Sequence, residues 1–214
     1  MILHNYFRSS ASYRVRIALN LKGLAYEYRP VHLSRGGGEQ FTPEFRALSP
    51  LAVVPVLEHA GKRLTQSLAI LEYLDEIQPE PPLLPPAPLE KARVRALALS
   101  VACEIHPLNN LRVLNYLTGT LGATADAKNA WYRHWVSLGL NALEQELRES
   151  PFTGKFCHGD APTMADCCLI PQLFNARRFE CDLSPYRTLL AIEETCLALP
   201  SFGAAAPERQ PDAE

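Results

Sequence analysis

The sequence predicts a mixed α/β domain followed by an all-helical domain. Up to about residue 80, strand-like segments alternate with helix-like segments, and no strand-like alternation of apolar and polar residues follows that point. Six of the ten residues at 79–88 are prolines, which form neither a regular helix nor a central strand. We therefore expect an α/β domain over residues 1–82, a linker over 83–88 and a helical domain over 89–214.

Strands and helices follow the order β-α-β-α-β-β-α in the first domain. The first strand is a short apolar run, and the second is rich in aromatic and branched side chains. Gly23 stops the first helix, because glycine adopts the left-handed conformation that ends helices, and Ala60-Gly61 turns a hairpin. The expected strands cover residues 1–6, 26–32, 53–58 and 62–65, and the expected helices cover residues 10–22, 43–48 and 67–77.

The pattern beyond the linker is helical. Pro107 kinks or breaks the first of these helices. From Gly203 onward, alanine, proline and charged residues predict a tail that lies extended on the surface or frays. The expected helices cover residues 89–117, 125–150, 163–176 and 184–199.

Composition excludes several classes of function. The 214 residues are 47% hydrophobic, so the chain can bury a core. The formal net charge of −2 shows no general basic character that would point to nucleic acid or an anionic membrane surface. No apolar run reaches the roughly 18 residues that a membrane span needs. His4, Asn5 and Arg8 interrupt the apolar run that a signal peptide would require.

The cysteines indicate a reduced protein. All of them follow residue 100 and none forms a C-x-x-C pair, which argues against a disulfide framework, a zinc site and a thioredoxin-type redox pair. We therefore expect mostly buried free thiols, no bound metal and a cytoplasmic location. The six are Cys103, Cys157, Cys167, Cys168, Cys181 and Cys196.

The most informative motif is Ser9-Ser10-Ala11-Ser12, at the start of the first expected helix. A lone serine at such a place is usually a helix cap. Three serines in four positions, followed by Arg14 and Arg16, favour a binding site, because the first turn of a helix carries unsatisfied N–H groups and a partial positive charge. The motif predicts a site for a thiolate or a carboxylate.

Two dipeptides near the hairpin point the same way. Val54-Pro55 is either an edge-strand proline or a cis-proline that turns the backbone of Val54 toward a bound peptide. Gln66-Ser67 opens the next helix, where Ser67 either caps the helix or helps to receive a peptide carboxylate.

These motifs, in this order, resemble the zeta-class glutathione transferases of the maleylacetoacetate isomerase type. The resemblance covers essentially the whole chain, and the serine motif together with Gln66-Ser67 is its most specific part. It implies a thioredoxin-like N-terminal domain that binds glutathione, an all-helical C-terminal domain and a homodimer. The matching stretches are residues 9–19, 54–55, 66–70, 106–112, 178–179, 182–186 and 210–212.

The resemblance also implies roles for individual residues. Ser9, Ser10 and Ala11 correspond to residues at the thiol end of glutathione. Gln40 corresponds to a residue at the glycyl end, and Val54 to one that pairs with the cysteinyl unit through its backbone. The other correspondences are Gln66 and Ser67 for the γ-glutamyl end, and His106, Asn110 and Arg112 for closure of the site from the helical domain.

Arginines suit the substrate side, where carboxylates and developing negative charge need stabilisation. Arg178 corresponds to an arginine that faces the substrate carboxylate in the resembling family, and Arg8 and Arg112 are further candidates. Each of them could instead be a solvated surface side chain. His106 is a proton shuttle, a hydrogen-bond donor to glutathione or a structural histidine beside Pro107.

Ala11 bears on the chemistry. Many family members carry a cysteine here, which side reactions such as reductive dehalogenation need, whereas isomerisation needs only the glutathione thiolate. We expect Ser9 and Ser10 to stabilise that thiolate near neutral pH.

The resemblance implies a glutathione-dependent cis–trans isomerase that converts maleylacetoacetate to fumarylacetoacetate in tyrosine and phenylalanine breakdown. Three alternatives stay open. The chain could isomerise maleylpyruvate from gentisate degradation, act as a general glutathione transferase, or serve as a transferase-like binding module without catalysis.

Thr163 and Asp166 predict a structural feature rather than a catalytic one. Their spacing is that of a capping box, in which each side chain bonds the backbone of the other residue. The same helix carries Cys167-Cys168, which we expect to be packing residues.

Overall fold

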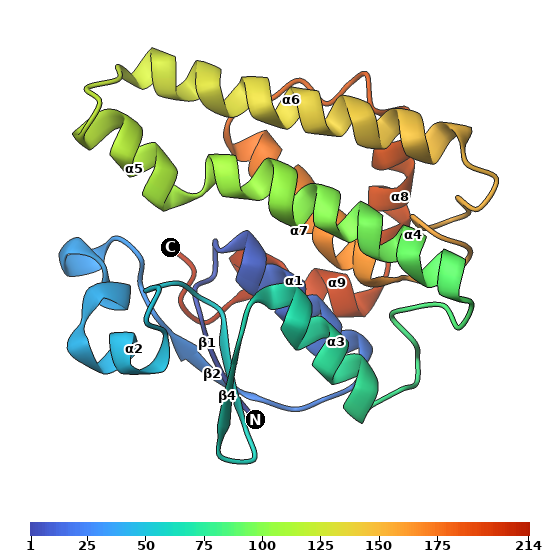
Figure 1. The fold of residues 1–214 in the computed structure, drawn as a ribbon, viewed down its shortest axis with the longest axis horizontal. Helices are drawn as coiled ribbons and strands as arrows, with labels where there is room; N and C mark the ends of the chain where they lie inside the picture. The colour runs from blue at the N-terminus through green and yellow to red at the C-terminus, as the bar shows by residue number, and fades with distance from the viewer. The chain divides into compact units, whose positions relative to one another are not determined.

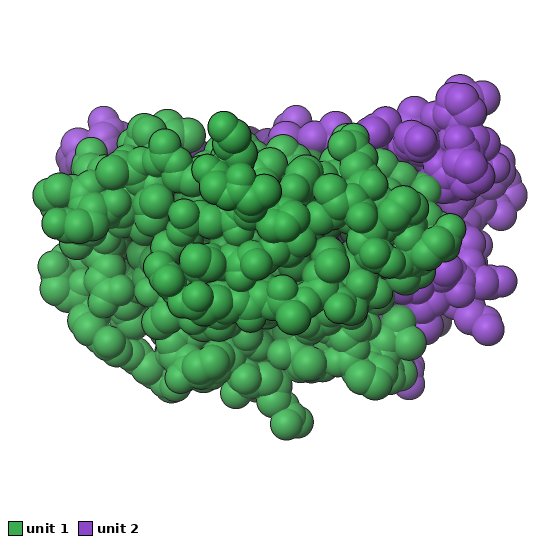
Figure 2. All heavy atoms as spheres, turned by 90° about the horizontal axis from the view of Figure 1, so that it is seen from below, with its two compact units in different colours: residues 1–84, 197–214 green, residues 85–196 purple.

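The computed structural model describes all residues from Met1 to Glu214. The chain divides into two compact units (Figure 2): unit 1 comprises Met1–Leu84 with Leu197–Glu214, and unit 2 comprises Pro85–Cys196. Unit 1 is α/β and unit 2 is helical, which confirms the predicted fold class.

Unit 1 is built on a four-stranded mixed sheet with the strand order β2-β1-β3-β4. β1 (Ile2–Asn5) pairs in parallel with β2 (Glu27–Pro30), and the connection between them runs through α1 (Ser10–Leu21). Parallel neighbours need such a crossover, because a tight turn can join only antiparallel strands.

The other half of the sheet is a hairpin. β3 (Val56–His59) pairs antiparallel with β1 and with β4 (Lys62–Thr65). The turn uses Ala60 and Gly61 at φ angles of 48° and 70°, the left-handed region that a two-residue hairpin turn requires.

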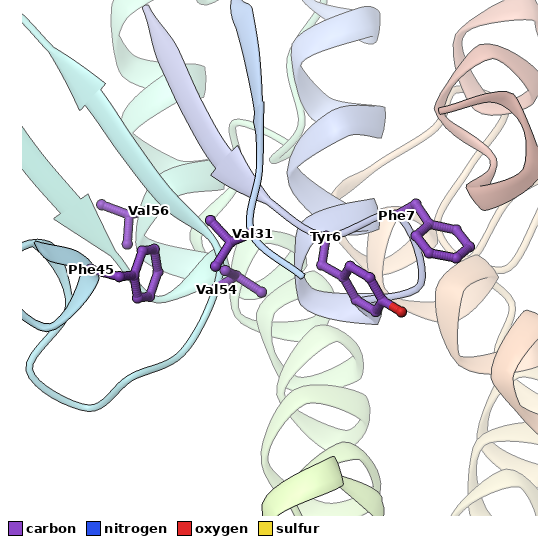
Figure 3. Packing of buried hydrophobic residues seen from close by; sticks show 6 residues of the cluster. All are labelled: Tyr6, Phe7, Val31, Phe45, Val54 and Val56. Carbon is purple, nitrogen blue, oxygen red and sulfur yellow. The ribbon is translucent and has the colours of Figure 1, made fainter. Parts of the chain in front are cut away.

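Helices cover both faces of this sheet (Figure 1). α1 and α3 (Ser67–Ile77) lie on one face, and α2 (Pro43–Leu48) lies on the other. Two 3₁₀ turns, η1 (Arg35–Gly37) and η2 (Glu39–Phe41), lie between β2 and α2. Around α2, a buried apolar cluster joins the strand ends to the β1–α1 turn (Figure 3); its members are Tyr6, Phe7, Val31, Phe45, Val54 and Val56.

The prediction of an extended or frayed tail after Gly203 is wrong. Instead, α9 (Pro200–Ala205) packs against α1, and the 3₁₀ turn η5 (Pro207–Arg209) follows it. Phe202 is completely buried. Sequence patterning missed this helix because its anchor lies on α1, where the buried guanidinium of Arg16 donates a hydrogen bond to the carbonyl of Ala205 at 3.0 Å.

Unit 2 departs from the predicted helices in one place. The expected helix over 89–117 is α4 (Pro88–Leu99), then the π-helical η3 (Ser100–Ile105), then the 3₁₀ turn η4 (His106–Asn109). The α-helix thus ends at Leu99, before Pro107, which lacks the N–H group that a continuous α-helix would use at that position. The remaining helices of unit 2 are α5 (Leu111–Gly119), α6 (Ala125–Glu149), α7 (Met164–Arg178) and α8 (Arg187–Leu197).

α7 begins with the predicted capping box. Asp166 Oδ2 accepts a hydrogen bond from the backbone N–H of Thr163 at 2.7 Å, and Asp166 Oδ1 accepts one from the N–H of Cys157 at 2.8 Å. Asp166 is fully buried, and this burial raises its pKa. The residue therefore joins a loop to the helix start, which confirms its predicted structural role. None of the helices, including the 25-residue α6, combines the length and apolar character of a membrane span.

Candidate functional site

The serine motif begins helix α1 in unit 1. Ser9 is the N-cap residue, and its hydroxyl oxygen accepts a hydrogen bond from the backbone N–H of Ser12 at 3.2 Å. Ser10 is the first helical residue and is 4% exposed. The capping interpretation therefore holds for Ser9, while the first turn of α1 keeps the partial positive charge that suits an anion.

A buried hydrogen bond links this helix to α3. Arg14, in the second turn of α1, donates from Nη1 to the Oγ of Ser67 at 3.2 Å. Ser67 is the first residue of α3 and is 7% exposed. The two predicted ends of the glutathione site, at Ser10 and Ser67, are thus tied together within one unit.

Gln66 precedes α3 in an unusual backbone conformation. Its φ is 69°, in the left-handed region that residues with a side chain rarely adopt. Gln66 is exposed and its side chain makes no cap hydrogen bond, so the first-turn N–H groups of α3 receive no help from it. Such strain is commonly retained where a ligand needs the resulting geometry.

Val54 lies just outside the sheet. Its bond to Pro55 is cis, the second of the two alternatives that the sequence left open. Pairing of β3 with β1 begins at Val56, opposite His4, so Val54 is not part of the strand ladder. Its side chain is buried in the cluster of Figure 3, which leaves its backbone as the part that could meet a ligand.

The Gln40 side chain is buried rather than exposed to solvent. It is 5% exposed, and its Nε2 donates to the carbonyl of Leu33 at 3.1 Å. Its Oε1 has no hydrogen-bond partner within the chain. An unsatisfied buried amide oxygen is costly, so this atom is a candidate acceptor for a ligand N–H group.

The predicted residues of unit 2 lie around the start of α5. His106 begins the turn η4, and Asn110 is the N-cap of α5, where its Oδ1 accepts from the N–H of Arg112 at 3.1 Å. Arg112 is exposed in the first turn of that helix. Asn110 thus has a capping role in addition to any contact with a ligand.

Arg178 ends α7 with its guanidinium held in place. Nη1 donates to Asn175 Oδ1 at 2.9 Å, and the guanidinium carbon lies 5.8 Å from the centre of the Phe179 ring. Phe179 in turn stacks on Tyr132 of α6, with ring centroids 3.6 Å apart and an interplanar angle of 11°.

A second residue of α6 contacts the residues that follow α7. Arg133 donates to the carbonyl of Phe179 at 3.0 Å and pairs with Glu180 at 3.0 Å. Two consecutive residues of α6, Tyr132 and Arg133, therefore set the position of the residues that follow Arg178.

The second arginine candidate, Arg8, belongs to unit 1. Its guanidinium lies 4.7 Å from the centre of the Phe7 ring and donates to the backbone carbonyl of Glu214 at 3.4 Å. Arg8 is therefore engaged with the C-terminus rather than freely solvated.

The comparisons with known proteins identify the family. The family model of the glutathione S-transferase N-terminal domain matches residues 3–82, and that of the C-terminal domain matches residues 137–189. A probable maleylacetoacetate isomerase from Vibrio cholerae is 53% identical over 100% of this chain and 98% of its own. The chain belongs to the glutathione S-transferase family.

Two solved structures of transferases share the complete fold. A holo structure of a maleylpyruvate isomerase, described as a bacterial zeta-class glutathione S-transferase, has a TM-score of 0.97 and 48% identity. A maleylacetoacetate isomerase from Methylobacterium extorquens AM1, with bound malonate and glutathione, has a TM-score of 0.96 and 42% identity. Both comparisons cover 100% of each chain. The first of them confirms the zeta-class type that the motifs together predicted.

The groups of unit 1 fit glutathione, the cofactor of this family. Glutathione is a tripeptide with a central thiol and a carboxylate at each end. The starts of α1 and α3 suit anions, and the buried Oε1 of Gln40 suits a peptide N–H. No three histidine, cysteine, aspartate or glutamate side chains are grouped to hold a metal ion.

Sequence analysis missed the residues that support the predicted ones. The motif pattern counts Arg14 and Arg16 as signs of an anion site, yet Arg14 donates to Ser67 and Arg16 donates to backbone carbonyls and to Asn5. Phe179 was visible beside Arg178, but nothing in the sequence indicated that Tyr132 stacks on it.

Proposed function

We propose that this protein catalyses the glutathione-dependent cis–trans isomerisation of maleylacetoacetate to fumarylacetoacetate, a step in tyrosine and phenylalanine breakdown. The observation that carries the proposal is the pair of linked helix starts in unit 1, Ser10 of α1 and Ser67 of α3, joined by the 3.2 Å hydrogen bond from Arg14. The 53% identity to a probable maleylacetoacetate isomerase along the whole chain supports the choice of substrate.

When bound, glutathione supplies a thiolate that adds reversibly to the cis double bond of the maleyl group, so that this bond can rotate before the thiolate leaves. We assign to the Ser10 hydroxyl and the first turn of α1 the task of holding the sulfur as an anion near neutral pH. Ser9 keeps that turn in place as its cap.

The remaining residues of unit 1 bind the peptide. Gln66 and Ser67 hold the γ-glutamyl carboxylate, the backbone of Val54 pairs with the cysteinyl unit, and Gln40 accepts from the glycyl end. The motif correspondence supports contacts from His106, Asn110 and Arg112 of unit 2 as well.

Arg178 binds a carboxylate of the substrate in this proposal. The fork geometry of a guanidinium suits a carboxylate, and the side chain loses less freedom on binding because Asn175 and Phe179 already orient it. Arg8 is the second candidate, although its contacts with Phe7 and Glu214 would have to persist or be exchanged.

Ala11 restricts the chemistry to that of glutathione. No thiol of this chain stands in the motif, and its free cysteines all lie in unit 2. Reactions that need a mixed disulfide with a motif cysteine are therefore disfavoured, whereas reversible addition of the glutathione thiolate needs no protein nucleophile.

Maleylpyruvate isomerisation is the second candidate function. It is favoured by the TM-score of 0.97 and 48% identity to a maleylpyruvate isomerase. The two substrates differ only in the keto-acid arm, so the same glutathione site would serve either one.

A side-by-side assay tests the proposal. Purified protein is given maleylacetoacetate and maleylpyruvate, each with and without glutathione, and substrate loss is followed spectroscopically. We expect turnover that depends on glutathione and favours maleylacetoacetate; a strong preference for maleylpyruvate would transfer the function to that substrate. Activity only on aromatic halides would indicate a general transferase, and no thermal shift with millimolar glutathione would favour a binding module.

We also propose that the protein is a cytoplasmic homodimer. Phe41 and Leu51 of unit 1 are 51% and 65% exposed and supply apolar surface for a second copy. Light scattering should give about twice the 23.8 kDa mass of one chain; the mass of a single chain would contradict the dimer.

A further inference from the structure

Asp212 holds the turn that leads into the serine motif. Its Oδ2 accepts a hydrogen bond from the backbone N–H of Phe7 at 3.2 Å, and its Oδ1 accepts one from the hydroxyl of Tyr28 on β2. A single carboxylate thus joins the end of the chain to the β1–α1 turn and to the neighbouring strand. Phe7 lies two residues before Ser9.

The same turn is held by Arg16, which is completely buried. Its guanidinium donates to the Asn5 side chain at 3.0 Å, to the Phe7 carbonyl at 2.9 Å and to the Ala205 carbonyl at 3.0 Å. A buried cation needs its donors satisfied, so these bonds keep α9 and the β1–α1 turn in one arrangement.

Gln210 sets the path of the last residues. Its Nε2 donates to the carbonyls of Ala204 at 2.9 Å and Ala206 at 2.8 Å, so it ties the last residues to the end of α9. Gln210 is 8% exposed, and Asp212 follows it by two positions. The C-terminal motif of Gln210 and Asp212 therefore has a defined structural role.

The chain end also reaches the segment that precedes Gln40. Glu214 pairs with Arg35 Nη2 at 2.6 Å and with His32 Nε2 at 3.2 Å. The His32 Nδ1 accepts from the N–H of Arg35 at 2.8 Å, which orders the start of η1. These pairs are partly exposed and therefore weaker than the bonds of Asp212.

The bonds of Asp212 do more than attach a tail. Burial of Phe202 holds α9 in unit 1, but a hydrophobic contact is not directional and does not orient the backbone of the β1–α1 turn. A hydrogen bond to the Phe7 N–H instead fixes the plane of that peptide and hence the direction in which the chain continues to Ser9.

We propose that Asp212 is a positioning residue for the thiol end of the glutathione site, acting through Phe7 on Ser9 and Ser10. The inference rests on the proposed function only through glutathione binding and not through the maleyl substrate.

The test measures glutathione on the full-length protein without any maleyl substrate. Calorimetry gives its dissociation constant, and thiolate absorbance against pH gives the thiol pKa of bound glutathione. For Asp212→Ala, we expect the dissociation constant to rise about tenfold, as for loss of a hydrogen bond to a charged group. We expect the bound thiol pKa to rise by about half a unit to one unit.

The sign of the pKa change separates positioning from charge. Removing a carboxylate near the site would by itself favour the thiolate and lower its pKa. A rise therefore reports a displaced serine motif rather than a changed electrostatic field. Glu208→Ala is the matched control, because Glu208 is an exposed carboxylate of the same segment and should leave both values unchanged.

A second variant guards against misfolding. Tyr28→Phe keeps Asp212 and removes one of its two hydrogen bonds, so it should give a smaller change in the same direction. If Asp212→Ala folds, a pKa of the bound glutathione thiol that stays constant or falls overturns the inference. If Asp212→Ala does not fold, the inference is overturned when Tyr28→Phe has the wild-type dissociation constant and the wild-type thiol pKa.

Measurements on the wild-type protein separate a failure of this inference from a failure of the proposed function. A wild type that does not bind glutathione overturns this inference together with the proposed function. A wild type that binds glutathione without isomerising either maleyl substrate overturns the proposed function alone.

Discussion

The hydroxyl oxygen of Ser9 accepts a hydrogen bond from the backbone N–H of Ser12 at 3.2 Å. The Ser9 side chain therefore caps α1, whereas Ser10 occupies the first helical position and is buried. The two neighbouring serines consequently have different tasks, and substitution of each should give a different result.

Ser10→Ala should lower turnover by about tenfold to a hundredfold with little loss of stability, because it removes one donor to the thiolate. Ser9→Ala should lower the free energy of unfolding by about 1 kcal/mol and affect turnover less. Steady-state kinetics and urea unfolding measure the two effects. Thr124→Ala removes the N-cap of α6 and is the control for a loss of stability away from the site. If neither serine variant changed turnover, the thiolate would be stabilised by groups other than these serines.

Gly38→Ala should weaken glutathione binding more than Gly37→Ala. Both glycines have positive φ angles, 108° and 86°, so a side chain strains the backbone by about 1–2 kcal/mol in either case. A methyl group at Gly38 would also lie 2.6 Å from Gln40 Nε2, whereas one at Gly37 meets nothing within 4 Å. Calorimetry with glutathione compares the two variants, and equal affinities would show that Gln40 does not bind the ligand.

Phe179→Leu should raise the KM for the maleyl substrate by roughly three- to tenfold, since it removes the ring that supports the Arg178 guanidinium and stacks on Tyr132. The affinity for glutathione should stay at the wild-type value. Phe152→Leu is the control, because Phe152 stacks on His158 elsewhere in unit 2. An unchanged KM in folded Phe179→Leu would show that the ring does not orient the substrate-binding arginine.

The protein should lose stability as pH rises above about 9. Burial raises the pKa of Cys157, Cys167 and Cys196 above the ordinary value of 9.0. The unfolded chain therefore releases these protons at lower pH than the folded chain does, so ionisation favours unfolding. Each thiol contributes up to about 1.4 kcal/mol per pH unit in this range.

Urea unfolding at pH 8, 9 and 10 measures that slope. Cys157→Ala should reduce it, whereas Cys103→Ala should not, because the Cys103 side chain is exposed rather than buried. A free energy of unfolding that stays constant from pH 8 to 10 would contradict the expected contribution of the buried thiols.

Local patterns were sufficient for much of this molecule. The order of strands and helices, the hairpin turn at Ala60-Gly61 and the capping box of Thr163 and Asp166 all follow from residues within a few positions of each other. The motifs around Ser10 and Ser67 were also found in this way, because an anion site at a helix start is built from consecutive residues.

Only the tertiary structure decided which partners support these motifs. Arg14 meets Ser67, Tyr132 meets Phe179, and Asp212 meets Phe7 across 205 positions of sequence. The position of α9 was likewise decided by the tertiary structure. Its composition predicts a loose tail, whereas the buried Arg16 donates a hydrogen bond to the Ala205 carbonyl at its end. A sequence specifies helix starts and turns through near neighbours, but the acceptors of a buried arginine or the donors to a distant carboxylate exist only once the chain has folded.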